Sequence, residues 1–181
     1  MKLTIESYIT GPAVDELYTV YLKAFLPLAL DAAAQHIMDA DEFAAQMADP
    51  RLDKYVVWDA DGVAIGLTTL TTDMSAVPWI SADFYSSRYP EHTASGRLFY
   101  LGITLVAPAH ERDGITGRIL AKIVRRLRDT GAVCGFDVCG RNDDVHHISA
   151  SIANLSRSMP VTVTKVDVQT YYVADFTACL N

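Results

Sequence analysis

The stretch that decides the fold runs from Leu101 to Leu120 and reads LGITLVAPAHERDGITGRIL. The apolar, β-rich run Arg97–Val106, bounded by Pro108, predicts a buried central strand. Apolar residues at spacings of three and four predict an amphipathic helix over Gly117–Thr130, which Gly131 ends. A strand that leads through a loop into a helix presents unpaired backbone N–H groups at the helix start, where the helix dipole also favours an anion. We therefore expect an anion-binding loop between these two elements.

The residues before this stretch predict a small set of strands and helices. Alternating polar and apolar residues indicate strands at Lys2–Thr10, Lys54–Asp59 and Val63–Thr71, the last two joined by the turn Asp59-Ala60-Asp61-Gly62. Helical spacing begins at Ala13 and should end near Leu26, before Pro27. A second short helix is expected over Asp41–Ala48, with Asp41 as its cap. Thr72–Gly96 mixes polar residues, prolines and aromatics, which predicts a long loop with one helical turn at most.

The residues after the stretch complete a mixed sheet. Ala132–Cys139 predicts another buried strand, and Asn142 is placed to cap a helix whose apolar stripe reaches Leu155. Val161–Val166 and Gln169–Phe176 predict a closing pair of strands. This order of elements belongs to the α/β class, in its mixed α+β form: a central mixed β-sheet flanked by helices. A chain of 181 residues without repeats or linkers is expected to form one domain, 1–181.

Composition narrows the classes of function. The formal net charge of −7 argues against general nucleic-acid binding, and no apolar run is long enough to span a membrane. Three cysteines and an N-terminus without a signal peptide favour a reduced, cytoplasmic setting. His36 and His110 lack partners at metal-ligand spacing, so we expect no metal. Five cations between Gly117 and Thr130 form either a solvated helix face or a patch for an anionic cofactor beside a cationic substrate.

The residues of the strand–loop–helix stretch resemble a known motif. Val106, Pro108, Gly114, Ile119 and Leu120 match the acetyl-CoA motif of the Gcn5-related N-acetyltransferase superfamily, and the order of elements also matches that fold. The resemblance implies transfer of an acetyl group from acetyl-CoA, as co-substrate, to the amine of a small molecule or peptide. It also implies that the strand backbone holds the pantetheine arm and polarises the thioester carbonyl, while the loop and helix hold the phosphates.

The loop departs from the family pattern at its most phosphate-exposed positions. Glu111 stands where the family has Arg or Gln, Arg112 where it has Gly, and Thr116 at the last small position. Sliding the motif by one residue places Arg112 and Gly117 on the pattern but loses Gly114 and the proline spacing. The cofactor contacts that the resemblance implies are Leu105, Val106, Ala107, Glu111, Arg112, Asp113, Gly114, Ile115, Thr116, Gly117, Arg118 and Asn142.

The proton-transfer residues follow less directly. Many family members carry a tyrosine seven residues beyond an asparagine, and counting from Asn142 gives Ser149, whose hydroxyl is a poor general acid. The candidate substitutes are Cys139, His146, Tyr171 and Tyr172. On the acceptor side, Asp73, Asp83, Tyr85 and Glu91 are placed to receive a cation; alternatively, the aromatic residues of Thr72–Gly96 cover the core or the surface of a homodimer. The rival function is a non-catalytic module that senses acyl-CoA or binds a protein.

Overall fold

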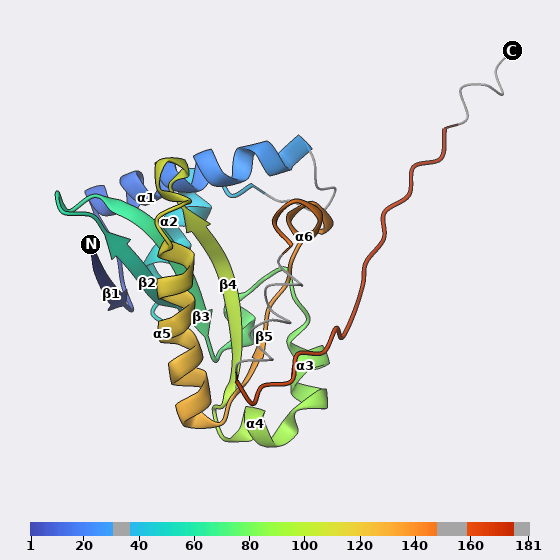
Figure 1. The fold of residues 1–181 in the computed structure, drawn as a ribbon. Coiled ribbons are helices and arrows are strands. Elements are labelled where there is room, and N and C mark those ends of the chain that lie inside the picture. Colours follow the sequence, from blue (N-terminus) through green and yellow to red (C-terminus); the bar gives the residue numbers. More distant parts are fainter. Residues whose placement is uncertain (31–36, 148–158, 176–181) are drawn as a thin grey trace, which may run out of the picture. The chain divides into compact units, whose positions relative to one another are not determined.

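The computed structural model describes residues 1–30, 37–147 and 159–175 (Figure 1). Within these residues the chain divides into two compact units, each described here by itself. The first unit comprises residues 1–30 and 37–137, and the second comprises residues 138–147 and 159–175. The first unit contains the whole sheet.

The sheet has five strands in sequence order: β1 (Lys2–Glu6), β2 (Asp53–Trp58), β3 (Ala64–Thr71), β4 (Leu98–Val106) and β5 (Val133–Gly135). β1 to β4 pair antiparallel, and β5 pairs parallel to β4 after the crossover helix α5 (Ile115–Thr130). The mixed sheet flanked by helices that the sequence predicts is confirmed. Three of its strands, β2, β3 and β4, lie within one residue of their expected bounds, and β1 ends four residues early.

Helices cover the two faces of the sheet with separate apolar clusters. α1 (Pro12–Phe25) and α2 (Ala40–Ala48) pack on one face, where Leu17, Phe43 and Leu67 are fully buried. α5 packs on the other face through its isoleucines (Figure 1). The cap of α2 is Asp39 rather than the expected Asp41, because Asp39 and Glu42 form a reciprocal capping box.

The segment expected to be a long loop contains three helical pieces: η2 (Met74–Ala76), α3 (Ala82–Arg88) and α4 (Pro90–Ala94). Local start signals explain them. The Ser81 hydroxyl caps α3 by accepting from Phe84 N at 3.2 Å, and Pro90 occupies the first turn of α4, where no N–H is needed. Earlier in the chain, Pro27 lies within a short 3₁₀ helix, η1 (Leu26–Leu30), that extends α1.

The C-terminal part of the prediction is wrong in three respects. β5 ends at Gly135 instead of continuing to Cys139. The helix that follows, α6 (Gly140–His146), has Cys139 at its cap position, so Asn142 lies inside the helix and does not cap it. Within the described residues 159–175 no strand forms, although two were expected.

β4 carries a bulge in its middle. Thr68 pairs with Thr104 and Leu70 with Leu101, so Gly102 and Ile103 stand together opposite Thr69. A Cβ on Gly102 would lie 2.5 Å from Thr69 Oγ1, so a larger side chain would clash there. The extra residue changes the alternation of side chains between the two faces of β4. As a result Tyr100 packs with α3, while Ile103 and Leu105 pack with α1.

Candidate cofactor and active site

The loop after β4 leads into a helix, α5, whose first turn has no side-chain cap within the described part of the chain. A 3₁₀ turn, η3 (Pro108–His110), leads to Gly114, whose φ of 70° places it in the left-handed region that glycine adopts freely. α5 then begins at Ile115, two residues earlier than the helix expected from Gly117. Arg118 N donates to Gly114 O at 3.1 Å, so the N–H groups of the three preceding residues have no helical partner. No side chain among the described residues caps this end, which leaves these N–H groups for an anion.

Two isoleucines fix the position of this helix start on the sheet. Ile115 and Ile119 are fully buried. A Cβ on Gly66 of β3 would lie 2.7 Å from Ile115 Cγ2, so the glycine lets the helix approach closely. Ile115, expected among the cofactor contacts, therefore uses its side chain for the core, and only its backbone N–H can meet a ligand.

The second half of β4 has one free edge. β5 pairs with β4 only along Leu98–Tyr100, so Leu101–Val106 continue without a neighbour on that side in the described part of the chain. Ala107 N donates to Ile65 O at 2.9 Å, which removes it from the expected thioester contacts. Because successive N–H groups of a strand point to opposite edges, the N–H of Val106 points toward the free edge. The side chain of Leu105 is buried against α1, so it contributes backbone only.

The charges of the loop are mixed. Glu111, Arg112, Asp113, Thr116 and Arg118 are exposed. Asp113 accepts from His110 Nδ1 at 2.7 Å when that nitrogen is protonated. Among the described residues neither Glu111 nor Arg112 forms an ion pair, so the loop itself offers a phosphate one guanidinium beside one unpaired carboxylate.

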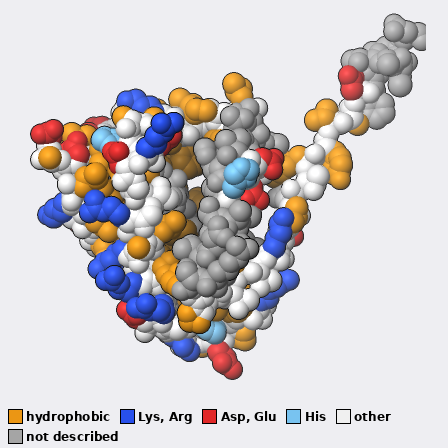
Figure 2. Space-filling model, in the orientation of Figure 1, with side chains coloured by type: hydrophobic (Ala, Val, Ile, Leu, Met, Phe, Trp, Pro, Cys, Tyr) orange, Lys and Arg blue, Asp and Glu red, His pale blue; other side chains and the backbone are white. Residues whose placement is uncertain are grey.

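Further cations lie along α5, and Figure 2 shows Lys and Arg side chains on the face that this helix occupies. Two of its arginines are engaged within the protein. Arg126 Nη1 lies 2.5 Å from Asp53 Oδ2, and Arg128 Nη2 lies 2.9 Å from Asp129 Oδ1. The exposed cations without a carboxylate partner among the described residues are Arg118, Lys122 and Arg125. The helix therefore carries a basic row that starts one turn after the uncapped N-terminus.

A tyrosine–aspartate pair that no sequence motif predicts lies where β4 and β5 separate. Tyr100, fully buried, donates its hydroxyl to Asp137 Oδ1 at 2.6 Å. Burial, followed by this carboxylate, raises the pKa of Tyr100 far above its usual range, so the hydroxyl stays protonated. The sequence does contain a signal: Asp137 is the one carboxylate inside the run Ala132–Cys139, which predicts a buried strand.

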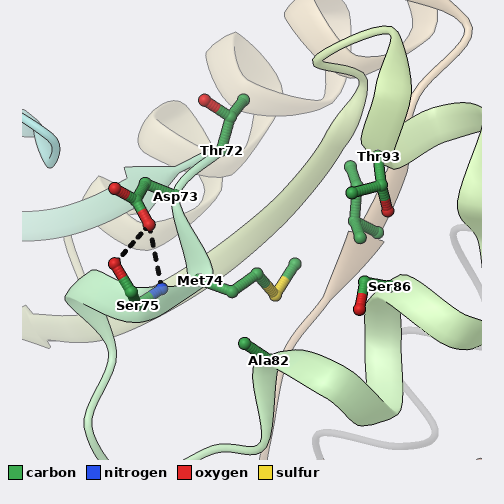
Figure 3. A pocket seen from close by; sticks show the side chains of 8 residues that line it. Thr72, Asp73, Met74, Ser75, Ala82, Ser86 and Thr93 are labelled. Atoms are coloured by element: carbon green, nitrogen blue, oxygen red, sulfur yellow. Dashed lines mark hydrogen bonds between the residues drawn. The ribbon is translucent and has the colours of Figure 1, made fainter.

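Of the residues expected on the acceptor side, Asp73 borders a hollow, and its role toward an acceptor stays a prediction. The hollow, of about 330 Å³, is formed by η2, α3, α4 and the start of β4 (Figure 3). Asp73 Oδ1 accepts from Ser75 N at 3.0 Å and from Ser75 Oγ at 2.6 Å. These bonds lower the pKa of Asp73, so the carboxylate is ionised at neutral pH. The residues lining the hollow are Thr72, Asp73, Met74, Ser75, Ala82, Ser86, Thr93 and Leu98.

The remaining predicted residues belong to the second unit or lie outside the described residues. Cys139 and Asn142 lie at the start of α6, and Tyr171 is exposed in a segment without secondary structure. Ser149 lies outside the described residues, and of His146 only the helical backbone is described. The catalytic roles of Ser149, His146, Tyr171 and Cys139 therefore stay predictions.

Two buried hydroxyls yield a stability prediction. Thr68 and Thr104 face each other across β3 and β4, and neither Oγ1 has a hydrogen-bond partner among the described residues. A buried unpaired hydroxyl costs about 1–3 kcal/mol, whereas an apolar group of the same shape does not. The double variant Thr68→Val, Thr104→Val should therefore raise the free energy of unfolding by about 1–3 kcal/mol in urea denaturation. A lower free energy would show that these hydroxyls are hydrogen-bonded in solution.

Comparison with known proteins supports the fold. No family model and no curated protein matches the sequence. One similar solved structure is the ribosomal-protein-S18-alanine N-acetyltransferase of Escherichia coli, with a TM-score of 0.52, 13% sequence identity and coverage of 83% of this chain and 76% of that chain. An acetyltransferase of Trypanosoma brucei has a TM-score of 0.51 and 12% identity, over 94% of this chain and 100% of that chain. A transcriptional regulator from Bacillus halodurans C-125 has a TM-score of 0.56 and 10% identity, over 94% of this chain and 100% of that chain. At these identities the likeness concerns the fold, and it confirms the fold expected from the motif and the order of elements.

No helix among the described residues is long and apolar enough to cross a membrane. No group of three or more His, Cys, Asp or Glu side chains within the same residues is arranged to hold a metal ion.

Proposed function

We propose that this chain, which has the fold of the Gcn5-related N-acetyltransferase superfamily, transfers an acetyl group from acetyl-CoA to an amine by direct attack in a ternary complex. The observation that carries the proposal is the uncapped start of α5 next to the free edge of β4. An anion site and an open strand edge, joined by one short loop, suit a ligand with phosphates at one end and an amide-containing arm at the other.

The residues present can hold the parts of acetyl-CoA. The N–H groups of Ile115, Thr116 and Gly117 would bind the pyrophosphate, and Arg118 would add charge. A Cβ on Gly117 would have no atom of the described residues within 4 Å, so these residues leave the space in front of this backbone open. The Val106 N–H would bind an amide of the arm at the free edge of β4. Backbone donors further along that edge would stabilise the oxyanion that develops when the amine attacks the thioester.

A second candidate function is a module that binds acyl-CoA, or a protein partner, without catalysis. The exposed carboxylate of Glu111 beside the helix start favours it, because a negative charge there weakens phosphate binding. One structural neighbour is named as a transcriptional regulator rather than an acetyltransferase. Release of free CoA in the presence of primary amines separates the two functions, since only the enzyme produces it.

Gly117→Ala tests the phosphate site with two effects of opposite sign. Alanine is the better helix former by about 0.8–1 kcal/mol, and the open space accepts its methyl group, so the free energy of unfolding should rise by that amount. The same methyl group would keep a phosphate from the backbone, so acetyl-CoA should bind more weakly. Thermal-shift titration with acetyl-CoA measures both effects. At a concentration of about 100 times Kd, acetyl-CoA adds about 2.7 kcal/mol to the free energy of unfolding of the wild type. The same concentration should add less to the free energy of unfolding of the variant.

Two results would count against this placement of acetyl-CoA. An unchanged affinity in Gly117→Ala would move the phosphates away from the start of α5. Absence of any shift in the wild type at millimolar acetyl-CoA would contradict both candidate functions that involve acyl-CoA. The cytoplasmic setting, the cationic acceptor and the homodimer stay part of the proposal and rest on the sequence alone.

A further inference from the structure

The point where β4 and β5 separate is a natural end for the acyl arm. β4 pairs with β5 up to Tyr100 and Gly135, and the free residues Leu101–Val106 span about 20 Å at ~3.3 Å per residue. If the phosphates lie at the start of α5, the arm extends back along this edge toward Tyr100. The thioester end would then reach the pair formed by Tyr100 and Asp137. This placement rests on the proposed function.

The carboxylate at that point is held in place by groups of the first unit. The Tyr100 hydroxyl donates to Asp137 Oδ1 at 2.6 Å, and the ring of Tyr85 meets the ring of Tyr100 edge-on at 5.6 Å between centroids. Gly135 lies against both rings, two residues before Asp137. Asp137 is exposed, and no cation among the described residues pairs with it. One carboxylate oxygen is thus fixed, while the other remains for a ligand.

The neighbouring part of β4 is also suited to a cation. Gly102 has no side chain, and the ring of Trp79 lies 3.9 Å from the place that a Cβ on Gly102 would occupy. Trp79 is 48% exposed. An indole ring attracts an ammonium group electrostatically, as a carboxylate does. Trp79 thus lies beside β4 at Gly102, two residues from Tyr100, whose hydroxyl holds Asp137.

We propose that Asp137, positioned by Tyr100, binds the ammonium group of the acceptor and accepts its proton before attack. The nitrogen then forms a bond to the thioester carbon, and the bond from that carbon to sulfur breaks. Of the two protons that the ammonium loses, one passes through Asp137 to solvent and the other ends on the CoA thiolate. Tyr100 is a positioning residue: its hydroxyl fixes the direction of the carboxylate.

The experiment uses the full chain with saturating CoA and two probes of nearly the same shape. Benzylamine is an ammonium ion at neutral pH, whereas aniline is neutral. Titration followed by ligand-observed NMR gives the dissociation constant of each probe. We expect benzylamine to bind the wild type more tightly than aniline does. Asp137→Asn should raise the dissociation constant of benzylamine at least tenfold and leave the dissociation constants of aniline and CoA unchanged. Asp129→Asn, an exposed aspartate on α5, is the matched control and should change neither probe.

Tyr100→Phe separates positioning from packing. It should weaken the binding of benzylamine several-fold without changing the affinity for CoA. The control is Tyr55→Phe, which removes another buried hydroxyl bonded to a charged group and should leave the affinity for benzylamine unchanged. Equal affinities of wild type and Asp137→Asn for benzylamine, with CoA bound, would overturn this inference and leave the proposed function standing. Failure of the wild type to bind CoA would overturn both. If Tyr100→Phe weakens the binding of CoA and of benzylamine together, the hydrogen bond between Tyr100 and Asp137 has a structural role alone.

Discussion

Replacing Ile119 with alanine is expected to lower the free energy of unfolding by about 2–5 kcal/mol. Ile119 is fully buried between α5 and the sheet, where it packs with Tyr55, Phe99 and Ile123. Gly66 brings β3 so close to this part of the helix that the backbone cannot move inward to fill the cavity without displacing Ile115. The lost contacts therefore add the cost of an unfilled cavity to the lost burial. Urea denaturation followed by circular dichroism measures the change.

Two variants on the same helix calibrate this result. Ile119→Val removes a single methylene and should cost about 0.5–1.5 kcal/mol, while Lys122→Ala changes an exposed side chain and should stay within about 0.5 kcal/mol. Because the same packing holds the start of α5 in place, Ile119→Ala should also weaken acetyl-CoA binding. A loss below about 1 kcal/mol would mean that the helix shifts to close the cavity, and that the close contact at Gly66 does not fix its position.

The sequence predicts the centre of the fold well because long elements carry repeated signals. β4 is defined by an apolar run and α5 by a stripe of isoleucines and leucines; β4 lies within one residue of its expected bounds, and α5 ends where expected but begins two residues earlier. The sequence does not predict α3 and α4 because each is at most seven residues long. So short a helix repeats its apolar positions too few times to show a helical period. Their signals, a Ser cap and a Pro in the first turn, act on one or two residues and are easily read as loop signals.

The candidate site was predicted in part, and the errors have local causes. The apolar stripe from Ile119 predicts a helix over Gly117–Thr130, but the burial of Ile115 brings the two preceding residues into α5 as well. The Tyr100–Asp137 pair depends on a hydrogen bond between residues 37 positions apart, which no short motif records. The end of β5 was missed because the apolar run continues past Gly135, whereas pairing with β4 stops there.

Gly135→Ala is expected to lower the free energy of unfolding by about 1–3 kcal/mol, the usual cost of overpacking a core. The new methyl carbon would lie 2.8 Å from Tyr85 Cε1 and 2.9 Å from Tyr100 Cδ2, closer than carbon atoms approach without displacement. Both rings would have to move, and Tyr100 would draw its hydroxyl away from Asp137. The variant should therefore lose affinity for benzylamine together with stability, as measured by urea denaturation and the same NMR titration.

A matched glycine and a second-site change make this prediction specific. A Cβ on Gly140 would have no atom within 4 Å in the part of the chain that the structure describes, so Gly140→Ala should not destabilise the protein. Tyr85→Leu removes one of the two rings that Gly135→Ala displaces, so the double variant should cost less than the sum of the single variants, with a coupling of about 0.5–3 kcal/mol. Strict additivity would mean that Tyr85 yields freely and that Tyr100 alone opposes the methyl group. Unchanged stability in Gly135→Ala would show that neither ring is fixed, which would also remove the rigid support argued for Asp137.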